Sequence, residues 1–222
     1  MEKIYTALGL MSGTSLDGVD VSIIKSDGKE EFAPIFNKYY KYDEKIIQKI
    51  LEIRSKITNF EKLNIYSKEL DNIEREITLF HSNAVLDTLN LSKSNIDLIG
   101  FHGQTIFHDP KNKITKQLGD GKLLSQLTKK KVVYNFRQND LKNDGQGAPL
   151  TPVFHNLLAH KIRKEFNLVF PINILNIGGI SNITVTVDET NSKDLNKIFA
   201  YDIGPGNCMI DQWVRKNSKK KI

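Results

Sequence analysis

Cysteine is nearly absent from the 222-residue sequence, which contains it only once, at Cys208. A single cysteine cannot form an internal disulfide, and it excludes a zinc site built from several cysteines. Chains with so little cysteine are typical of reducing compartments, so the sequence predicts a cytoplasmic protein.

Long hydrophobic segments are also missing. Residues 1–11 contain a short apolar run, but no basic region precedes it and no small-residue cleavage site follows it, so we expect no signal peptide. Residues 170–187 lack charge but include Asn173, Asn176 and Asn182, which makes the segment too polar for a bilayer. We therefore expect no membrane partner.

Arginine is scarce, and the positive charge of the chain is unevenly distributed. There are 32 Lys and Arg residues against 26 Asp and Glu, but five of the basic residues lie at 215–221, which leaves 27 basic against 26 acidic in residues 1–214. Nucleic-acid binding requires positive charge over a face or a groove, so we expect no nucleic-acid partner. The alternative, binding by the basic tail, requires salt-sensitive affinity that is lost on deletion of 215–222.

Hydrophobic periodicity predicts an α/β fold with mixed sheets flanked by helices. Three strands are followed by helices, and the same order begins again after residue 145, which predicts a first lobe at 1–145 and the beginning of a second at 146–222. The expected strands are 3–11, 18–25, 31–41, 96–101, 132–136, 172–177, 183–188 and 198–202. The expected helices are two within 43–90 and one each at 121–130, 152–164 and 207–216.

The segment Met11–Asp20 contains more Gly, Ser, Thr and Asp than a simple strand connection needs. Glycines let the backbone approach an anion, hydroxyl and N–H groups bind phosphate oxygens, and a carboxylate can hold Mg²⁺ through water. The chain contains no Gly-x-x-x-x-Gly-Lys-Ser/Thr, which excludes a P-loop as the phosphate site. The alternative interpretation is an ordinary hairpin turn at Asp17 and Gly18.

Two further polar segments follow predicted strands. His102–Thr105 comes at the end of a buried strand, where polar side chains are well placed to face a cleft, although a structural histidine is the more common outcome. Arg137 precedes the flexible segment Gly145–Leu150, and its planar guanidinium suits a carboxylate or a phosphate. The alternative for Arg137 is a surface ion pair.

The last polar segments are Asn176–Asn182 and Tyr201–Asn207. The segment Asn176–Asn182 is similar in composition to Met11–Asp20 and is interpreted as a second phosphate-binding loop. In the second, Asp202 ends a strand beside a Gly-Pro-Gly turn that opens a helix, and this position suits a general base near a phosphoryl acceptor.

These segments together resemble the bacterial anhydro-N-acetylmuramic acid kinases, in order and over nearly the whole chain. The resemblance implies an actin/hexokinase-like ATPase fold and an enzyme of cell-wall (peptidoglycan) recycling and amino-sugar metabolism. It implies that ATP and Mg²⁺ are used to open the 1,6-anhydro ring of the sugar and phosphorylate O6, giving N-acetylmuramate 6-phosphate.

The resemblance also implies roles for individual residues. Asp202 is the implied catalytic base, and Asp17 helps to order Mg²⁺ through water. The implied ATP-binding residues are Gly13, Thr14, Ser15, Leu16, Asp17, Gly18, Val19, Asp20, Gly178 and Gly179. The implied sugar-binding residues are His102, Gln104, Thr105, Arg137, Gln146 and Gly147.

The chain departs from this family pattern in two ways. Asn135, Gln138 and Asn139 stand where the family usually has an Asp and further arginines around Arg137, which predicts weaker sugar or phosphate binding. The family's chains are also longer, so we expect a C-terminal truncation with an incomplete second lobe. The alternatives to an active kinase are an inactive remnant and one half of a split kinase, and the expected protein partner is a second copy or a complementing C-terminal fragment.

Overall fold

A computed structural model describes residues 3–187 and 199–218. The chain divides into two compact units, Met1–Gly147 and Ala148–Ile222. The expected strand ends at residues 188 and 198, and the lysines at 219–221, lie outside the described residues.

The first unit is built on a five-stranded mixed sheet with the order β3-β2-β1-β4-β7. The strand β1 pairs antiparallel with β2 and parallel with β4, and β4 pairs parallel with β7. Alternate residues such as Leu8, Val21 and Ile23 are fully buried on one face, as the period-two pattern predicts. The strands are β1 (Tyr5–Met11), β2 (Gly18–Ser26), β3 (Phe32–Lys41), β4 (Leu98–Phe101) and β7 (Lys131–Tyr134).

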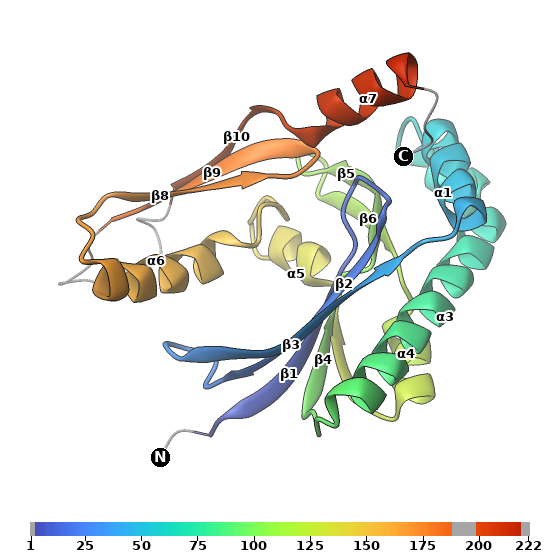
Figure 1. The fold of residues 1–222 in the computed structure, drawn as a ribbon. Coiled ribbons are helices and arrows are strands. Elements are labelled where there is room, and N and C mark those ends of the chain that lie inside the picture. The colour runs from blue at the N-terminus through green and yellow to red at the C-terminus, as the bar shows by residue number, and fades with distance from the viewer. Residues whose placement is uncertain (1–2, 188–198, 219–222) are drawn as a thin grey trace. The chain divides into compact units, whose positions relative to one another are not determined.

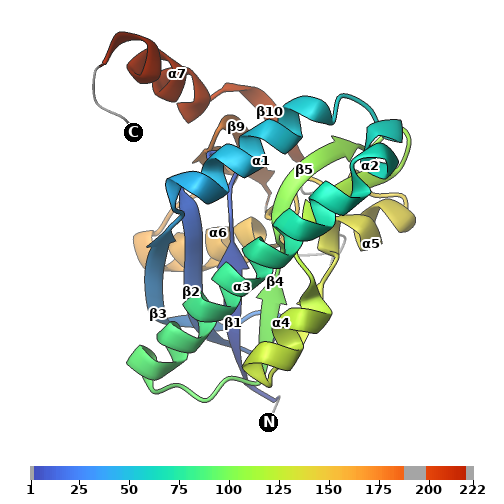
Figure 2. The same ribbon diagram turned by 90° about the vertical axis from the view of Figure 1, so that its right-hand side faces the viewer.

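Helices α1, α3 and α4 lie on that face of the sheet (Figures 1 and 2). Their apolar residues recur every three or four positions, as Ile46, Ile50 and Ile53 do on α1, and become buried against the strands. Two helices were expected within residues 43–90, but the structure has three because the second helical segment is interrupted at Tyr66. The helices are α1 (Glu44–Lys56), α2 (Glu61–Ile65), α3 (Ser67–Ser92) and α4 (Gly121–Thr128).

A hairpin and a short helix were not expected from the sequence. The strands β5 (Gln104–Asp109) and β6 (Ile114–Leu118) form a separate two-stranded sheet. Helix α5 (Phe136–Lys142) begins at the end of the strand expected at 132–136 and precedes the flexible segment Gly145–Leu150. Both elements follow the carboxyl ends of parallel strands, so they add side chains at the edge where β4 and β7 end.

The second unit contains a three-stranded antiparallel sheet with the order β10-β9-β8. Helix α6 (Pro152–Phe166) packs against β8 and β9, and His155 Nδ1 lies 2.7 Å from the hydroxyl of Thr184. The strand expected at 183–188 begins earlier, at Ile180. The elements are β8 (Ile172–Ile177), β9 (Ile180–Thr186), β10 (Phe199–Pro205) and α7 (Asn207–Asn217).

The α/β class with a mixed sheet covered by helices, expected from the sequence, is confirmed. In the described part of the chain no helix combines the length and the apolar character that crossing a membrane requires.

Candidate active site

The loop between β1 and β2 follows a path that is fixed at two points. Leu16 is buried in the core and takes a left-handed φ of 61°, and its N–H donates to the carbonyl of Gly13 over 3.4 Å. At Gly18 a Cβ would lie 2.2 Å from the carbonyl oxygen of Tyr40, so only glycine fits there. The loop is therefore more constrained than an ordinary hairpin turn.

Two neighbouring segments hold the same loop from outside. The N–H of Tyr42 donates to the carbonyl of Asp17 over 3.0 Å, and Nη1 of Arg54 donates to the carbonyl of Thr14 over 3.2 Å. The side chains of Thr14, Ser15 and Asp17 remain exposed. The loop consequently offers hydroxyl groups, a carboxylate and backbone N–H groups to a ligand.

A buried polar network connects this loop to β5. The hydroxyl of Ser12 donates to Oε1 of Gln104 over 2.6 Å, and Nε2 of Gln104 donates to the carbonyl of Gly13 over 3.1 Å. Gln104 is fully buried and both polar atoms of its side chain are bonded. This corrects the expectation that the Gln104 side chain faces the sugar, because that side chain is directed into the loop.

Asp17 and Asp20 bring two carboxylates to the loop without an ion-pair partner for either among the described residues. Burial, and then the negative charge of Asp17, raise the pKa of Asp20. The hydroxyl of Ser15 donates to Oδ1 of Asp17 over 2.5 Å. Residues 3–187 and 199–218 contain no group of three or more acidic, His or Cys side chains that could enclose a metal. Two carboxylates do fit Mg²⁺, which keeps most of its water ligands.

The ATP-binding residues implied by the resemblance differ in what they expose. Val19, like Leu16, has its side chain in the core, so only the backbone of these two residues is available to a nucleotide. Thr14, Ser15, Asp17 and Asp20 are exposed. A nucleotide at this loop would therefore contact polar side chains and backbone only.

At the ends of β4 and β7, His102 and Arg137 form a hydrogen-bonded pair. Nε of Arg137 donates to Nε2 of His102 over 2.7 Å, and Nδ1 of His102 lies 2.7 Å from the carbonyl of Gly103. Burial, and then the positive charge of Arg137, lower the pKa of His102. Arg137 has no ion pair within the described residues, so the surface ion pair considered for it is not found there.

The segment around Gly147 packs beside this pair. Oδ2 of Asp140 accepts from the N–H of Gly147 over 2.7 Å, and a Cβ at Gly147 would lie 3.0 Å from the ring of His108. Burial, and then the charge of Arg137, lower the pKa of His108. Gln146 is exposed, whereas the hydroxyl of Thr105 is buried and finds no hydrogen-bond partner within residues 3–187 and 199–218. The implied sugar-binding residues other than Gln104 thus lie near polar groups at one edge of the unit.

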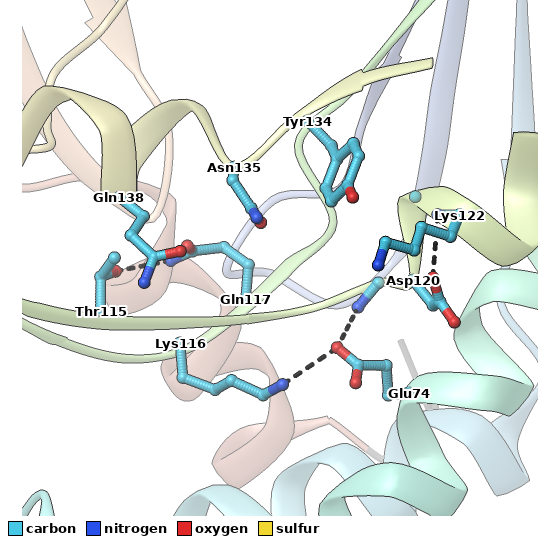
Figure 3. Close-up of a pocket in the computed structure, with 11 residues that line it drawn as sticks. Glu74, Thr115, Lys116, Gln117, Asp120, Lys122, Tyr134, Asn135 and Gln138 are labelled. Atoms are coloured by element: carbon cyan, nitrogen blue, oxygen red, sulfur yellow. Dashed lines mark hydrogen bonds and ion pairs between the residues drawn. The ribbon is translucent and has the colours of Figure 1, made fainter. Parts of the chain in front are cut away.

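A polar pocket of about 360 Å³ opens beside the ends of β6 and β7 (Figure 3). Tyr134, Asn135 and Gln138 line it from β7 and α5, and Lys122 lines it from the first turn of α4. Asp120 caps this helix by accepting from the N–H groups of residues 122 and 123. This pocket was not expected from the sequence, although the Gly119-Asp120-Gly121 turn was a signal for it.

A single carboxylate organises the floor of the pocket. Oε1 of Glu74 accepts from Nζ of Lys116 over 3.0 Å and from the N–H of Gly119 over 2.9 Å. Figure 3 shows this carboxylate between the lysine and the turn. Because Lys116 is already paired with Glu74, Lys122 is the pocket cation with the more available charge, and the amides of Asn135 and Gln138 supply neutral hydrogen-bonding groups.

In the second unit, the β8–β9 turn holds the beginning of α7. The carbonyls of Gly179 and Gly178 accept from the N–H groups of Gly206 and Asn207 over 3.0 and 2.8 Å. A Cβ at Gly206 would lie 2.3 Å from the carbonyl of Gly178, so the close approach requires glycine. The carbonyls of this turn are thus engaged by α7, and contact with phosphates by Gly178 and Gly179 stays a prediction.

Asp202 lies on β10 directly opposite Asn182 of β9, and the strand register shifts between Asp202 and Gly204. Asp202 is exposed, whereas Oδ1 of Asn182 is buried and has no hydrogen-bond partner among the described residues. Opposite residues in such a pair have Cβ atoms about 5 Å apart. Asp202 thus presents an exposed carboxylate at a strand irregularity just before α7 begins.

A model of the anhydro-N-acetylmuramic acid kinase family matches residues 5–222. Proteins named anhydro-N-acetylmuramic acid kinase are similar to the chain over almost its full length. One from Pelagibacter ubique is 51% identical over 100% of this chain and 57% of its own. Those from Rhizobium etli and Agrobacterium fabrum are 40% and 38% identical over 96% and 99% of this chain, and 56% and 58% of theirs. The chain thus spans slightly more than half the length of these curated relatives.

Proposed function

The chain belongs to the anhydro-N-acetylmuramic acid kinase family, and on that premise we propose that it serves ATP-dependent conversion of 1,6-anhydro-N-acetylmuramic acid to N-acetylmuramate 6-phosphate. The product is an intermediate expected of peptidoglycan recycling and amino-sugar catabolism. A supply of ATP and a single cysteine favour a cytoplasmic setting.

One observation supports this proposal above the others. Strands β1, β4 and β7 are parallel neighbours. The loop between β1 and β2, here named the phosphate loop, follows the carboxyl end of β1, and the His102–Arg137 pair and the polar pocket lie at the carboxyl ends of β4 and β7. Ligands of open α/β sheets bind at this edge. A kinase needs a phosphate site beside an acceptor site, and the first unit presents both kinds of groups at the same edge.

We assign the nucleotide phosphates to the loop between β1 and β2. Its exposed hydroxyls at Thr14 and Ser15 suit phosphate oxygens, and Asp17 with Asp20 would hold Mg²⁺ through water. When bound, Mg²⁺ neutralises phosphate charge, which is the main requirement of phosphoryl transfer.

We assign the sugar to the polar pocket and to Arg137, which lies on the same helix, α5, as the pocket residue Gln138. A monosaccharide presents hydroxyl and amide groups, which match Asn135 and Gln138, and its lactyl group carries a carboxylate. Arg137 uses Nε for His102 and has no anion paired with its other nitrogens among the described residues. The remaining guanidinium nitrogens of Arg137 suit the lactyl carboxylate of the sugar, and Lys122 adds a second positive charge.

Asp202 is our proposed base. It would take a proton from the water that attacks the anomeric carbon while the bond from that carbon to O6 breaks, and O6 accepts the γ-phosphoryl group as ADP leaves. The role rests on an exposed carboxylate at a strand irregularity beside the start of α7.

A second candidate function is one half of a two-part kinase. Strand β8 is at the edge of its sheet with no outer neighbour in the described ranges, whereas β1 of the first unit has β4 there. One face of that sheet leaves Leu175, Phe199 and Tyr201 more than half exposed. An open edge with an apolar face favours a further strand and helix, which a second polypeptide could supply.

The test is product formation from the sugar and MgATP in H₂¹⁸O, with ¹⁸O expected at the anomeric hydroxyl. The chain is assayed alone and with the part of the Pelagibacter ubique relative that has no counterpart in it.

Turnover by the chain alone supports the kinase, and turnover only in the mixture supports the two-part form. Loss of the mixture's activity in Leu175→Asp but not in Ile65→Asp, an exposed aliphatic residue of the first unit, places the attachment on the sheet. No turnover by the chain alone or by the mixture contradicts both proposed functions and leaves a non-enzymatic remnant. Size-exclusion chromatography with light scattering distinguishes a homodimer.

A further inference from the structure

The buried amide of Gln104 belongs to the first residue of β5, where the connection from β4 ends. Its side chain and that of Ser12 have 0% and 2% of their surface exposed. The phenol of Tyr42 lies 2.9 Å from the Ser12 hydroxyl and is equally buried. Buried polar groups of this kind must find partners, and these three find one another.

The direction of each hydrogen bond follows from the partners. The carbonyl of Gly13 can only accept, so the NH₂ end of Gln104 faces it and the Oε1 end faces Ser12. Ser12 therefore donates its one hydroxyl proton to Gln104, and Tyr42 donates to Ser12. The relay runs from Tyr42 to Ser12 to Gln104 and ends on the backbone of the phosphate loop.

The hydrogen bond from Gln104 to the Gly13 carbonyl determines the orientation of the Gly13–Thr14 peptide group. In a trans peptide the C=O and the following N–H are directed oppositely. A Gly13 carbonyl directed inward at Gln104 therefore turns the N–H of Thr14 away from the core. That N–H has no protein acceptor in the described part of the chain, and Thr14 is exposed.

We propose that Gln104 is a positioning residue that holds the Gly13–Thr14 peptide with its N–H outward, ready to donate to a phosphate oxygen. The inference rests on the proposed function for the identity of the ligand, whereas the loop geometry it describes does not. Without the Gln104 donor, the Gly13 carbonyl loses its shortest hydrogen bond and retains only the 3.4 Å contact from Leu16. The peptide is then free to rotate, and the outward donor is lost for part of the time.

The first variant is Gln104→Met, which keeps the length of the side chain and removes both hydrogen bonds. We expect amide hydrogen exchange in residues 13–17 to rise roughly tenfold, and the Kd for MgATP to rise by a similar factor. The matched control is Thr128→Val, which removes a buried hydroxyl bonded to Leu124 at the far end of α4. It should change neither quantity.

The second variant, Gln104→Glu, separates positioning from packing. A buried carboxylate cannot donate to the Gly13 carbonyl, but the protonated acid can, and it can still accept from Ser12. Loop protection and MgATP affinity should therefore be low at neutral pH and recover as the pH is lowered, while the wild-type chain shows no such recovery.

The outcomes distinguish this inference from the proposed function. Unchanged exchange at 13–17 in Gln104→Met, or a uniform rise over the whole chain without acid recovery in Gln104→Glu, overturns the positioning role. If Gln104→Met fails to fold, Ser12→Ala tests the same relay with a smaller change. A wild-type chain that does not bind MgATP contradicts the proposed function, and the exchange measurements without nucleotide still decide the role of Gln104.

Discussion

Nε of Arg137 donates to Nε2 of His102 over 2.7 Å, and this contact defines the proton positions on the imidazole. The carbonyl of Gly103 near Nδ1 can only accept, so Nδ1 carries the proton and Nε2 is the acceptor for Arg137. The ring is neutral in this arrangement. Burial and the charge of Arg137 lower the pKa of His102, which preserves the neutral form. The pair thus orients a guanidinium whose remaining donors can bind an anion.

Arg137→Lys tests that orientation. Lysine has no Nε donor for His102 and no planar fork, so we expect sugar affinity to fall at least roughly tenfold with little change in unfolding temperature. Calorimetric titration with the sugar measures it. Arg75→Lys, an exposed arginine of the same unit, is the control and should bind as the wild type does. Equal affinities in the two variants would contradict the role of Arg137.

His81 on α3 predicts acid sensitivity of folding. Its ring is fully buried, 5.0 Å from that of Phe101, and burial lowers its pKa to about 4. In the unfolded chain the His81 ring protonates near its ordinary pKa of 6.5. The free energy of unfolding is therefore at its full value above that pH, and it decreases as the pH falls from 6.5 toward 4. The loss should be about 2 kcal/mol between about pH 7 and about pH 5.

Urea unfolding at the two pH values measures this loss in wild type and in His81→Leu, whose side chain suits the surrounding Tyr42 and Phe80. The variant should show a pH dependence smaller by that amount. His160→Leu serves as the matched control in the second unit. An unchanged pH dependence in His81→Leu would mean that another group carries the acid sensitivity.

Two glycines of the phosphate loop should differ in their tolerance of a methyl group. A Cβ at Gly18 would lie 2.2 Å from the Tyr40 carbonyl, whereas at Gly13 the nearest group is the Ser15 hydroxyl at 3.4 Å. Gly18→Ala should therefore lower the free energy of unfolding by about 2 kcal/mol or more, and Gly13→Ala by less than about 1 kcal/mol. Denaturant unfolding of both variants checks this, and equal losses would contradict the close approach of β2 and β3.

The alternating and helical patterns were sufficient to predict most elements of the fold, because burial decides which side chains face the core. The β5–β6 hairpin escaped prediction since its residues are mostly half-buried and show no clean period, as at Thr115 and Lys116. The role of Gln104 escaped for another reason. Its partners Ser12 and Gly13 are more than 90 residues away, and no local pattern marks such a contact. The same holds for Glu74, which reaches the pocket from α3.

Asp17→Asn tests the pairing of carboxylates at the loop. Burial and then Asp17 raise the pKa of Asp20, so removing the Asp17 charge should lower that pKa part of the way, because the burial remains. Nucleotide affinity should also become less dependent on Mg²⁺ concentration. NMR titration of Asp20 and calorimetry with ATP at two Mg²⁺ concentrations measure these effects. Asp71→Asn, an exposed carboxylate of α3, is the control, and a shift of the Asp20 titration there as large as in Asp17→Asn would rule out the proximity effect.

The base assignment leads to the last prediction, which concerns Asp202→Asn. The amide keeps the shape of the carboxylate at the β10 irregularity but cannot accept a proton, so turnover should fall roughly 10²- to 10⁴-fold while MgATP affinity is unchanged. Asp211→Asn on α7 is the matched control, because it removes a carboxylate from the neighbouring helix. The assay is ¹⁸O incorporation at the anomeric carbon in whichever preparation, the chain alone or the mixture, turns over. Should Asp202→Asn and Asp211→Asn lose activity equally, the carboxylate of Asp202 would be acting through the structure of the second unit, and the base would have to be sought elsewhere.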